Sequence, residues 1–183
     1  MTTFIGLIRG VNVGGHNMLP MAALKALCDS LKLACAKTYL QSGNVVFQST
    51  RKDRPQLRRD LEDAIRKKIG IDVKVILRTP DEVGSAMAAN PFPKRDPSRL
   101  LIMFLEGQPS DDAVQALRKA HAGPERIHFA GQELVIDYVN GVGRSKLSNA
   151  LIERKLALAG TARNWNTVSR LLELAENLNS PPE

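Results

Sequence analysis

Aromatic side chains and long apolar runs are both scarce in this sequence. One tryptophan, two tyrosines and five phenylalanines make up only 4% of the 183 residues. Sheets that bind single-stranded RNA stack its bases on exposed aromatic rings, so this composition disfavours such a surface. No run approaches the roughly 18 consecutive apolar residues that span a membrane, and the start, MTTFIGLIRG, lacks the features of a secretory signal. We therefore expect a cytoplasmic protein with no membrane partner.

Cysteine and histidine, which often bind transition metals, are rare as well. Cys28 and Cys35 have a spacing that matches neither a redox pair nor a zinc knuckle. Because both lie in apolar segments, we expect two buried free thiols. His16, His121 and His128 are scattered, and no set of histidine, cysteine and carboxylate residues has the spacing of a metal site. The sequence therefore predicts neither a metal nor a cofactor.

The charged residues are unevenly distributed along the chain. The whole sequence carries 26 basic and 19 acidic residues, a formal charge of +7. Fourteen basic and six acidic residues fall within residues 1 to 80, which gives that half a charge of +8, whereas residues 81 to 183 have a charge of −1. This asymmetry indicates an anionic partner, although it bears on attraction more than on specificity.

The first half of the sequence predicts six elements in the order β-α-β-β-α-β. Hydrophobic period and turn residues place these elements as follows: a strand over 3–9, a helix beginning at Pro20, strands over 36–40 and 44–49 joined at Ser42 and Gly43, a helix from Leu57 to Gly70, and a strand over 73–79. This order is typical of a ferredoxin-like α/β sandwich.

The second half nearly repeats the first. Its predicted elements are a short helix from Pro80, a strand over 99–105, a helix over 110–121, strands over 126–130 and 134–139, and two closing helices. The three prolines of NPFPKRDP, residues 90–97, mark the connection. We expect an α+β protein of two ferredoxin-like lobes, residues 1–79 and 80–183. Strands 3–9 and 100–105 are apolar on both faces, which favours lobes that pack together.

A first candidate site lies where the loop RGVNVGGHN and the turn QSGN meet, because strands one and three of such a lobe are antiparallel neighbours. Glycine lets backbone N–H groups approach an anion closely. The spacing of Gly10 and Gly15 resembles that of a phosphate-binding loop, but His16 and Asn17 replace the required Lys and Ser/Thr. The glycines equally suit a simple tight turn. The candidate residues are Arg9, Asn12, Gly14, Gly15, His16, Asn17, Gln41, Ser42 and Asn44.

A second candidate cluster lies near the end of the chain. The basic loop GVGRSKLSN offers Arg144, Ser145 and Lys146, which suit a phosphate or carboxylate. In TARNWNTV we expect a helix that starts near Asn164, capped by Thr161 or Asn164, with Trp165, Val168 and Leu172 on one buried stripe. One cap residue is sufficient, so the other polar groups are free to face an anion at the helix N-terminus. The candidates there are Arg163, Asn164, Asn166 and Thr167.

Four separated motifs resemble one known family. LIRGVNVGGHNMLPMAALK, TYLQSGNVVF, ANPFP and TARNWNTV follow one another over nearly the whole chain and are similar to the bacterial family called domain of unknown function 1697. The resemblance implies two ferredoxin-like α+β lobes in a cytoplasmic protein, and it implies no activity. Members of that family often carry lysine where this chain has His16, which weakens the comparison with a phosphate-binding loop.

Three functions are compatible with these patterns. The first is binding of a small anionic ligand, such as a nucleotide or phosphorylated metabolite, by the two candidate clusters. The second is weak, electrostatic binding of nucleic acid, suggested by the basic segment STRKDRPQLRRD, which also suits the solvated face of a helix. The third is a structural or protein-interaction role. A catalytic role is left open, because the sequence shows no nucleophile paired with a base and no close pair of carboxylates.

Overall fold

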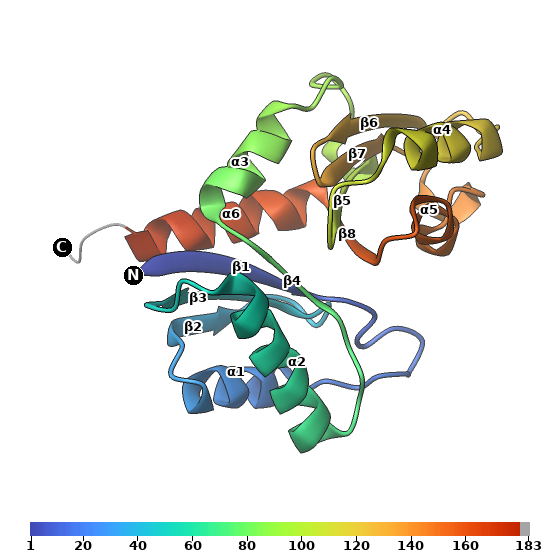
Figure 1. Cartoon of the computed structure of the whole chain (residues 1–183). Helices are drawn as coiled ribbons and strands as arrows, with labels where there is room; N and C mark the ends of the chain where they lie inside the picture. Colours follow the sequence, from blue (N-terminus) through green and yellow to red (C-terminus); the bar gives the residue numbers. More distant parts are fainter. Residues whose placement is uncertain (180–183) are drawn as a thin grey trace. The chain divides into compact units, whose positions relative to one another are not determined.

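The computed structural model describes residues 1 to 179, which form two compact units. The first consists of Met1–Val83 and residues 170 to 179, and the second of Gly84–Ser169. Each unit contains one four-stranded antiparallel sheet with helices packed on it (Figure 1). The prediction of an α+β fold with two ferredoxin-like lobes is therefore confirmed.

The first unit contains the predicted six elements. They are β1 (Thr2–Ile8), α1 (Met21–Ser30), β2 (Ala34–Thr38), β3 (Asn44–Ser49), α2 (Arg54–Ile69) and β4 (Val75–Arg78). The strands lie in the order β2-β3-β1-β4. Figure 1 shows α1 and α2 on the same face of this sheet. The core beneath them includes Phe4 and Ile8 of β1 and Phe47 of β3, together with the apolar stripes of both helices.

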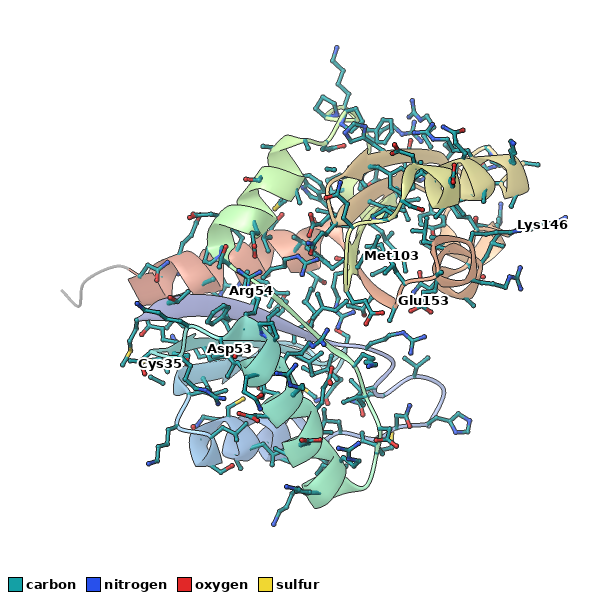
Figure 2. The ribbon with its side chains drawn as sticks, in the orientation of Figure 1. Cys35, Asp53, Arg54, Met103, Lys146 and Glu153 are labelled. Atoms are coloured by element: carbon teal, nitrogen blue, oxygen red, sulfur yellow. The ribbon has the colours of Figure 1, made fainter. Side chains whose placement is uncertain are left out.

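Local sequence signals explain the bounds of α2. The Asp53 carboxylate accepts a hydrogen bond from the Gln56 backbone N–H at 2.9 Å, which satisfies one of the free donors of the first turn (Figure 2). At the other end Gly70 adopts φ 82°, a left-handed conformation that glycine takes without steric cost. Between them Leu57, Leu61 and Ile65 face the core at helical spacing.

The second unit repeats this arrangement. Its elements are α3 (Pro80–Ala88), which begins in the first unit, a 3-10 turn (Pro97–Arg99), β5 (Leu100–Leu105), α4 (Asp111–Ala120), β6 (Arg126–Ala130), β7 (Glu133–Asp137), a second 3-10 turn (Val142–Arg144), α5 (Asn149–Leu156) and β8 (Gly160–Asn164). The strand order β6-β7-β5-β8 is that of the first sheet, element for element. The last helix, α6 (Trp165–Asn179), follows β8 directly.

The strand β8 corrects the prediction of two closing helices with no strand between them. Residues 160 to 164 pair with β5, with Arg163 opposite Ile102. The pattern was hidden because this strand begins with glycine and carries a buried arginine instead of alternating apolar residues. A Cβ atom on Gly160 would lie 2.6 Å from Met103 Cε and 3.1 Å from the Phe104 backbone oxygen, so close packing favours glycine here.

The start of α6 also differs from the expected one. The helix begins at Trp165, and its buried stripe is Val168, Leu171 and Ala175 rather than Trp165, Val168 and Leu172. Trp165 is only half-buried, so it is not the core residue that we expected. The far end of α6 belongs to the first unit, where the Leu178 carbonyl accepts a hydrogen bond from Gln48 at 2.9 Å.

The two cysteines have different environments. Cys28 of α1 is fully buried, and burial raises the pKa of its thiol to about 12. Cys35 is exposed, contrary to our expectation, because β2 shifts register between Ala34 and Lys37 and Cys35 itself adopts φ 54° (Figure 2). The irregularity is a β-bulge, which changes the direction of a side chain that regular alternation would have fixed.

The proline-rich segment of residues 90–97 is attached to the second sheet by charge. The carboxylate of Asp137, at the end of β7, is completely buried. Its Oδ2 atom lies 3.0 Å from Arg95 Nε and accepts a hydrogen bond from Arg126 Nε at 3.0 Å. The Arg126 guanidinium also lies over the ring of Phe92, 4.7 Å from its centre. The buried Asp137 carboxylate therefore holds the segment directly through Arg95, and indirectly through Arg126, whose guanidinium contacts Phe92.

Candidate functional site

The glycine-rich loop of the first unit does lie beside the turn between β2 and β3. The Asn12 side chain donates hydrogen bonds to the Gln41 carbonyl at 2.6 Å and to the Leu19 carbonyl at 2.9 Å. Its own amide oxygen accepts from the Leu19 backbone N–H at 2.8 Å. Asn12 therefore ties together the two segments that the sequence predicted to be neighbours.

Other polar residues of this cluster also bond to the loop and turn themselves. The Asn17 amide donates to the Gly10 carbonyl at 3.1 Å, and the Asn44 amide donates to the Tyr39 carbonyl and to Ser42 Oγ, each at 2.9 Å. Asn12 and Asn17 adopt left-handed backbone conformations. Gly14, Gly15 and His16 are exposed on the loop. Much of the polar chemistry here shapes the loop, and ligand binding by these residues stays a prediction.

The TARNWNTV cluster, in the second unit, is also largely structural in character. The Arg163 side chain is buried, and its Nη1 donates to Thr161 Oγ1 at 2.6 Å and to the Ala162 carbonyl at 2.9 Å. Burial lowers the pKa of its guanidinium to about 10. Asn164 Oδ1 accepts from the Thr167 backbone N–H at 2.8 Å and thereby caps α6, as expected. Asn166 is exposed.

The first unit contains an equivalent of Arg163. Arg78 ends β4 opposite Ile5, as Arg163 lies opposite Ile102, and each arginine donates from Nη1 to the carbonyl of the residue before it. Arg78 is likewise buried. The recurrence at matching strand positions favours a structural role for Arg163 over ligand contact.

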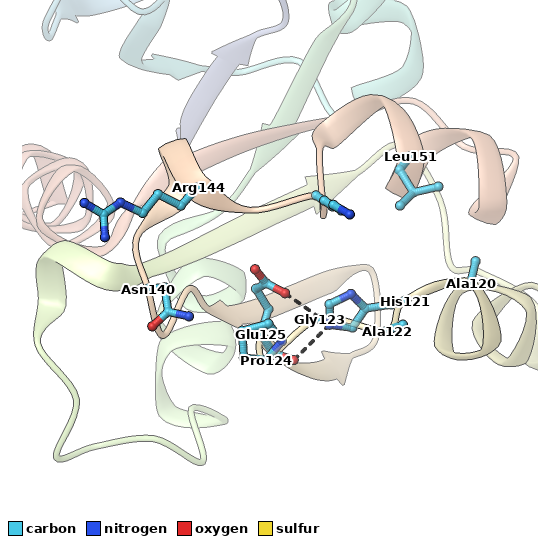
Figure 3. Close-up of a pocket in the computed structure, with 10 residues that line it drawn as sticks. Ala120, His121, Ala122, Gly123, Pro124, Glu125, Asn140, Arg144 and Leu151 are labelled. Atoms are coloured by element: carbon cyan, nitrogen blue, oxygen red, sulfur yellow. Dashed lines mark hydrogen bonds and ion pairs between the residues drawn. The ribbon is translucent and has the colours of Figure 1, made fainter.

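A pocket of about 660 Å³ lies in the second unit, between the segment that follows α4 and the segment that precedes α5 (Figure 3). Two of the three predicted residues of the basic loop, Arg144 and Lys146, line it, and both are exposed. Figure 2 shows Lys146 extending outward from this unit. The other lining residues are Ala120, His121, Ala122, Gly123, Pro124, Glu125, Asn140 and Leu151.

His121 and Glu125 form a pair inside this pocket. His121 Nε2 lies 3.0 Å from the Glu125 carbonyl oxygen, and a carbonyl only accepts hydrogen bonds, so Nε2 carries the ring proton. The same nitrogen lies 3.5 Å from Glu125 Oε2 (Figure 3). A Cβ atom on Gly123 would lie 2.1 Å from Oε2 and 2.9 Å from His121 Cε1. A side chain at position 123 would therefore displace the Glu125 carboxylate or the His121 ring.

The Glu125 carboxylate is buried and charged. Burial by itself raises the pKa of its carboxyl, but the hydrogen bond from Ser145 and the nearby His121 outweigh that effect and lower the pKa below its ordinary value. Oε2 accepts no hydrogen bond from the described residues. Ser145 thus supports the pair from the basic loop, and the pocket contains an ionised acceptor atom beside a histidine ring.

Tyr138 fixes the start of the basic loop. Its hydroxyl donates to the Leu147 carbonyl at 2.9 Å, and its side chain is buried. Burial, with a smaller effect of the Glu125 charge, raises the pKa of Tyr138 to about 12, so this residue stays neutral at physiological pH. The loop that carries Arg144 and Lys146 is therefore anchored at both of its ends.

Sequence reasoning singled out the basic loop but missed His121 and Glu125. They are four residues apart just past the end of α4, and α4 ends at Ala120, so helical periodicity gave no reason to pair them. The available signal was a histidine and a glutamate flanking the Gly123–Pro124 turn. Neither residue type is rare enough at that spacing to have been decisive.

A second pocket, of about 610 Å³, lies in the first unit between α2 and the segment before β4. It is rich in arginine, and Arg9 of the first predicted cluster belongs to it. Its carboxylates pair with those arginines: Arg66 contacts Asp63 and Asp72, and Arg58 Nε lies 4.0 Å from Glu62. Internal ion pairs therefore offset much of its positive charge.

The basic segment STRKDRPQLRRD is also paired with carboxylates. Arg51 bonds to Asp60, and Arg54 Nη1 lies 2.8 Å from Glu82 Oε1. Among residues 1 to 179, no group of three or more histidine, cysteine, aspartate or glutamate side chains is placed to hold a metal ion. Within the same described part of the chain, no helix has both the length and the apolar character needed to cross a membrane.

A family model described as "Protein of unknown function (DUF1697)" matches residues 1–134. The chain belongs to the DUF1697 family. The DUF1697 match includes His121 and Glu125 of the pocket, whereas Arg144 and Lys146 lie beyond it. No curated protein matches the chain. A solved structure, the conserved bacterial protein SP0830 from Streptococcus pneumoniae, is similar over 95% of this chain and 98% of its own, with 22% identity and a TM-score of 0.76. At that identity the similarity bears on the fold alone.

Proposed function

We propose that this DUF1697 protein binds a small anionic molecule, such as a nucleotide or a phosphorylated metabolite, in the pocket lined by His121, Arg144 and Lys146, and that it does so in the cytoplasm. The observation that carries the proposal is the pocket itself, where two exposed cationic side chains and a histidine border one cavity. Its volume of about 660 Å³ falls within the roughly 300 to 1,000 Å³ typical of small-molecule sites.

Charge and chemistry favour this pocket over the other candidates. Arg144 and Lys146 form no ion pair with another described residue, whereas in the α2 pocket Arg66 pairs with Asp63 and Asp72, and Arg58 lies near Glu62. Guanidinium and ammonium groups form charge-assisted hydrogen bonds to phosphate. Leu151 adds an apolar wall, which suits a ligand with an organic part beside its anionic group.

The test is a calorimetric titration with sulfate, inorganic phosphate and adenosine monophosphate at fixed ionic strength. The double variant Arg144→Ala, Lys146→Ala should weaken binding at least about tenfold, which corresponds to about 1.4 kcal/mol. The control Arg154→Ala, Lys155→Ala removes the same charge from the last turn of α5. It should leave affinity within about twofold, because its side chains do not line the pocket.

Two results would overturn the proposal. An equal loss in both double variants would mean diffuse electrostatic attraction rather than a site. Absence of binding by wild-type protein for all three probes would remove the anion-binding role altogether.

A further inference from the structure

His121 has one ring nitrogen left for a ligand. Its Nε2–H is directed at the Glu125 carbonyl, 3.0 Å away, so Nδ1 is the polar ring atom that remains for contact within the pocket. On a neutral ring Nδ1 carries a lone pair and repels an anion. On a protonated ring Nδ1 carries a hydrogen and attracts one. The proton on His121 therefore decides the sign of its contribution to anion binding.

Glu125 favours the protonated ring. Its carboxylate is buried, ionised and 3.5 Å from Nε2, where the low dielectric strengthens attraction to an imidazolium. The Oε2 atom accepts no hydrogen bond from the described residues, so its charge is free to act on the ring. The Gly123 backbone lies directly against both side chains, which keeps them in place.

The other charged groups around His121 oppose protonation of its ring, and the neutral groups do not influence it. Arg144 and Lys146, from the loop before α5, carry positive charge and disfavour a further proton while the pocket is empty. Arg118 and Lys119 in the last turn of α4 act in the same sense. Tyr138 and Ser145 are neutral, and α5 contributes the apolar Leu151. A bound anion neutralises the cations and so shifts the balance toward protonation.

We propose that the pocket takes up its anion together with a proton on His121, so that anion affinity falls as pH rises. The inference rests on the proposed function and adds pH regulation to it. With His121 protonated, three positive groups and the Glu125 carboxylate border the cavity, a net charge of 3 − 1 = +2, which matches a dianion such as a phosphate monoester better than a monoanion. Glu125 acts as a positioning residue, because it holds the ring and favours the charged form.

Sulfate is the suitable probe, because it stays a dianion over the range from about pH 5 to about pH 8, in which an imidazole is the side chain that changes its charge. Wild-type protein should show a constant dissociation constant at low pH and a rise of up to about tenfold per pH unit on the alkaline side, as expected when one proton binds with the ligand. His121→Gln should bind weakly with no pH dependence. His128→Gln, on β6 and outside the lining of the pocket, should keep the wild-type profile.

A second measurement needs no variant. Calorimetry of sulfate binding in two buffers of different ionisation enthalpy gives the number of protons taken up, and we expect a value near one on the alkaline side. Glu125→Gln should reduce the number of protons taken up with sulfate, because the carboxamide cannot pair with an imidazolium 3.5 Å away. Circular dichroism and the melting temperature establish that this buried substitution has left the fold intact.

The outcomes separate the two proposals. Sulfate binding with a flat pH profile and no proton uptake would overturn the inference and leave anion binding standing. An unchanged pH profile in His121→Gln would assign the proton to another group and overturn the inference as well. No sulfate binding at any pH, together with none of phosphate or adenosine monophosphate, would remove both.

Discussion

Replacement of Asp137 should show how strongly one buried carboxylate holds the proline-rich segment to the second sheet. The side chain is fully buried, and the two arginines that contact its Oδ2 atom are 33% and 49% exposed. Breaking a fully buried ion pair costs about 3 to 5 kcal/mol. When Asp137 is replaced, the two partly exposed arginines can be hydrated instead, so the loss of stability is smaller than this. The substitution also removes the cost of burying a carboxylate.

We expect Asp137→Asn to lower the free energy of unfolding by about 2 kcal/mol, the scale of one charge-assisted hydrogen bond lost after screening. Asp137→Ala should cost about 3 kcal/mol, since it also empties a buried position. Urea unfolding followed by the fluorescence of Trp165 measures both, because this only tryptophan of the chain lies in the second unit.

The control is Asp112→Asn in the first turn of α4. It removes the same charge from an exposed position and should cost at most about 1 kcal/mol through the helix dipole. If Asp137→Asn unfolded within about 0.5 kcal/mol of wild type, burial of the carboxylate would cancel its ion pairs, and the attachment we describe would add no net stability.

Two further predictions concern packing and thiol chemistry. Gly160→Ala should destabilise the second unit by about 1 to 3 kcal/mol, because the new Cβ would overlap Met103 and lie 2.9 Å from Leu105 Cδ2; a melting temperature equal to that of wild type would show that β8 yields without cost. At pH 8 a thiol reagent should modify Cys35 within minutes and Cys28 only on unfolding, since Cys28 is buried with a pKa of about 12. Rapid reaction of both thiols in the folded protein would contradict this.

Most elements of the first unit could be predicted from the sequence, because its signals are local and agree with one another. The apolar stripe of α2, Asp53 at its start and Gly70 at its end all predict the same helix, and the structure has it. Hydrophobic period failed at β8, where packing against Met103 selects glycine and where Arg163 is buried by its surroundings. Such a strand is specified by tertiary contacts, and these are invisible in a window of a few residues.

The candidate site was harder to predict than the fold. Arg144, Ser145 and Lys146 stand out in the sequence as a basic loop, and two of them, Arg144 and Lys146, line the pocket. His121 and Glu125 acquire meaning only when the turn at Gly123 brings the ring and the carboxylate together. The asparagines of the first cluster show a different difficulty, because polar side chains that brace a loop look in sequence like side chains that bind a ligand, and ligand binding by them stays a prediction.

The β-bulge at Cys35 affects whether a strand of another copy of the protein can pair with β2. β2 lies at the edge of the first sheet, where a row of backbone donors and acceptors would invite a strand from another chain. The register shift between Ala34 and Lys37 interrupts that row halfway along a strand of five residues. An added strand would find matching partners on one side of the break and mismatched ones on the other. The bulge that exposes the Cys35 thiol thus also disfavours aggregation through the edge strand β2.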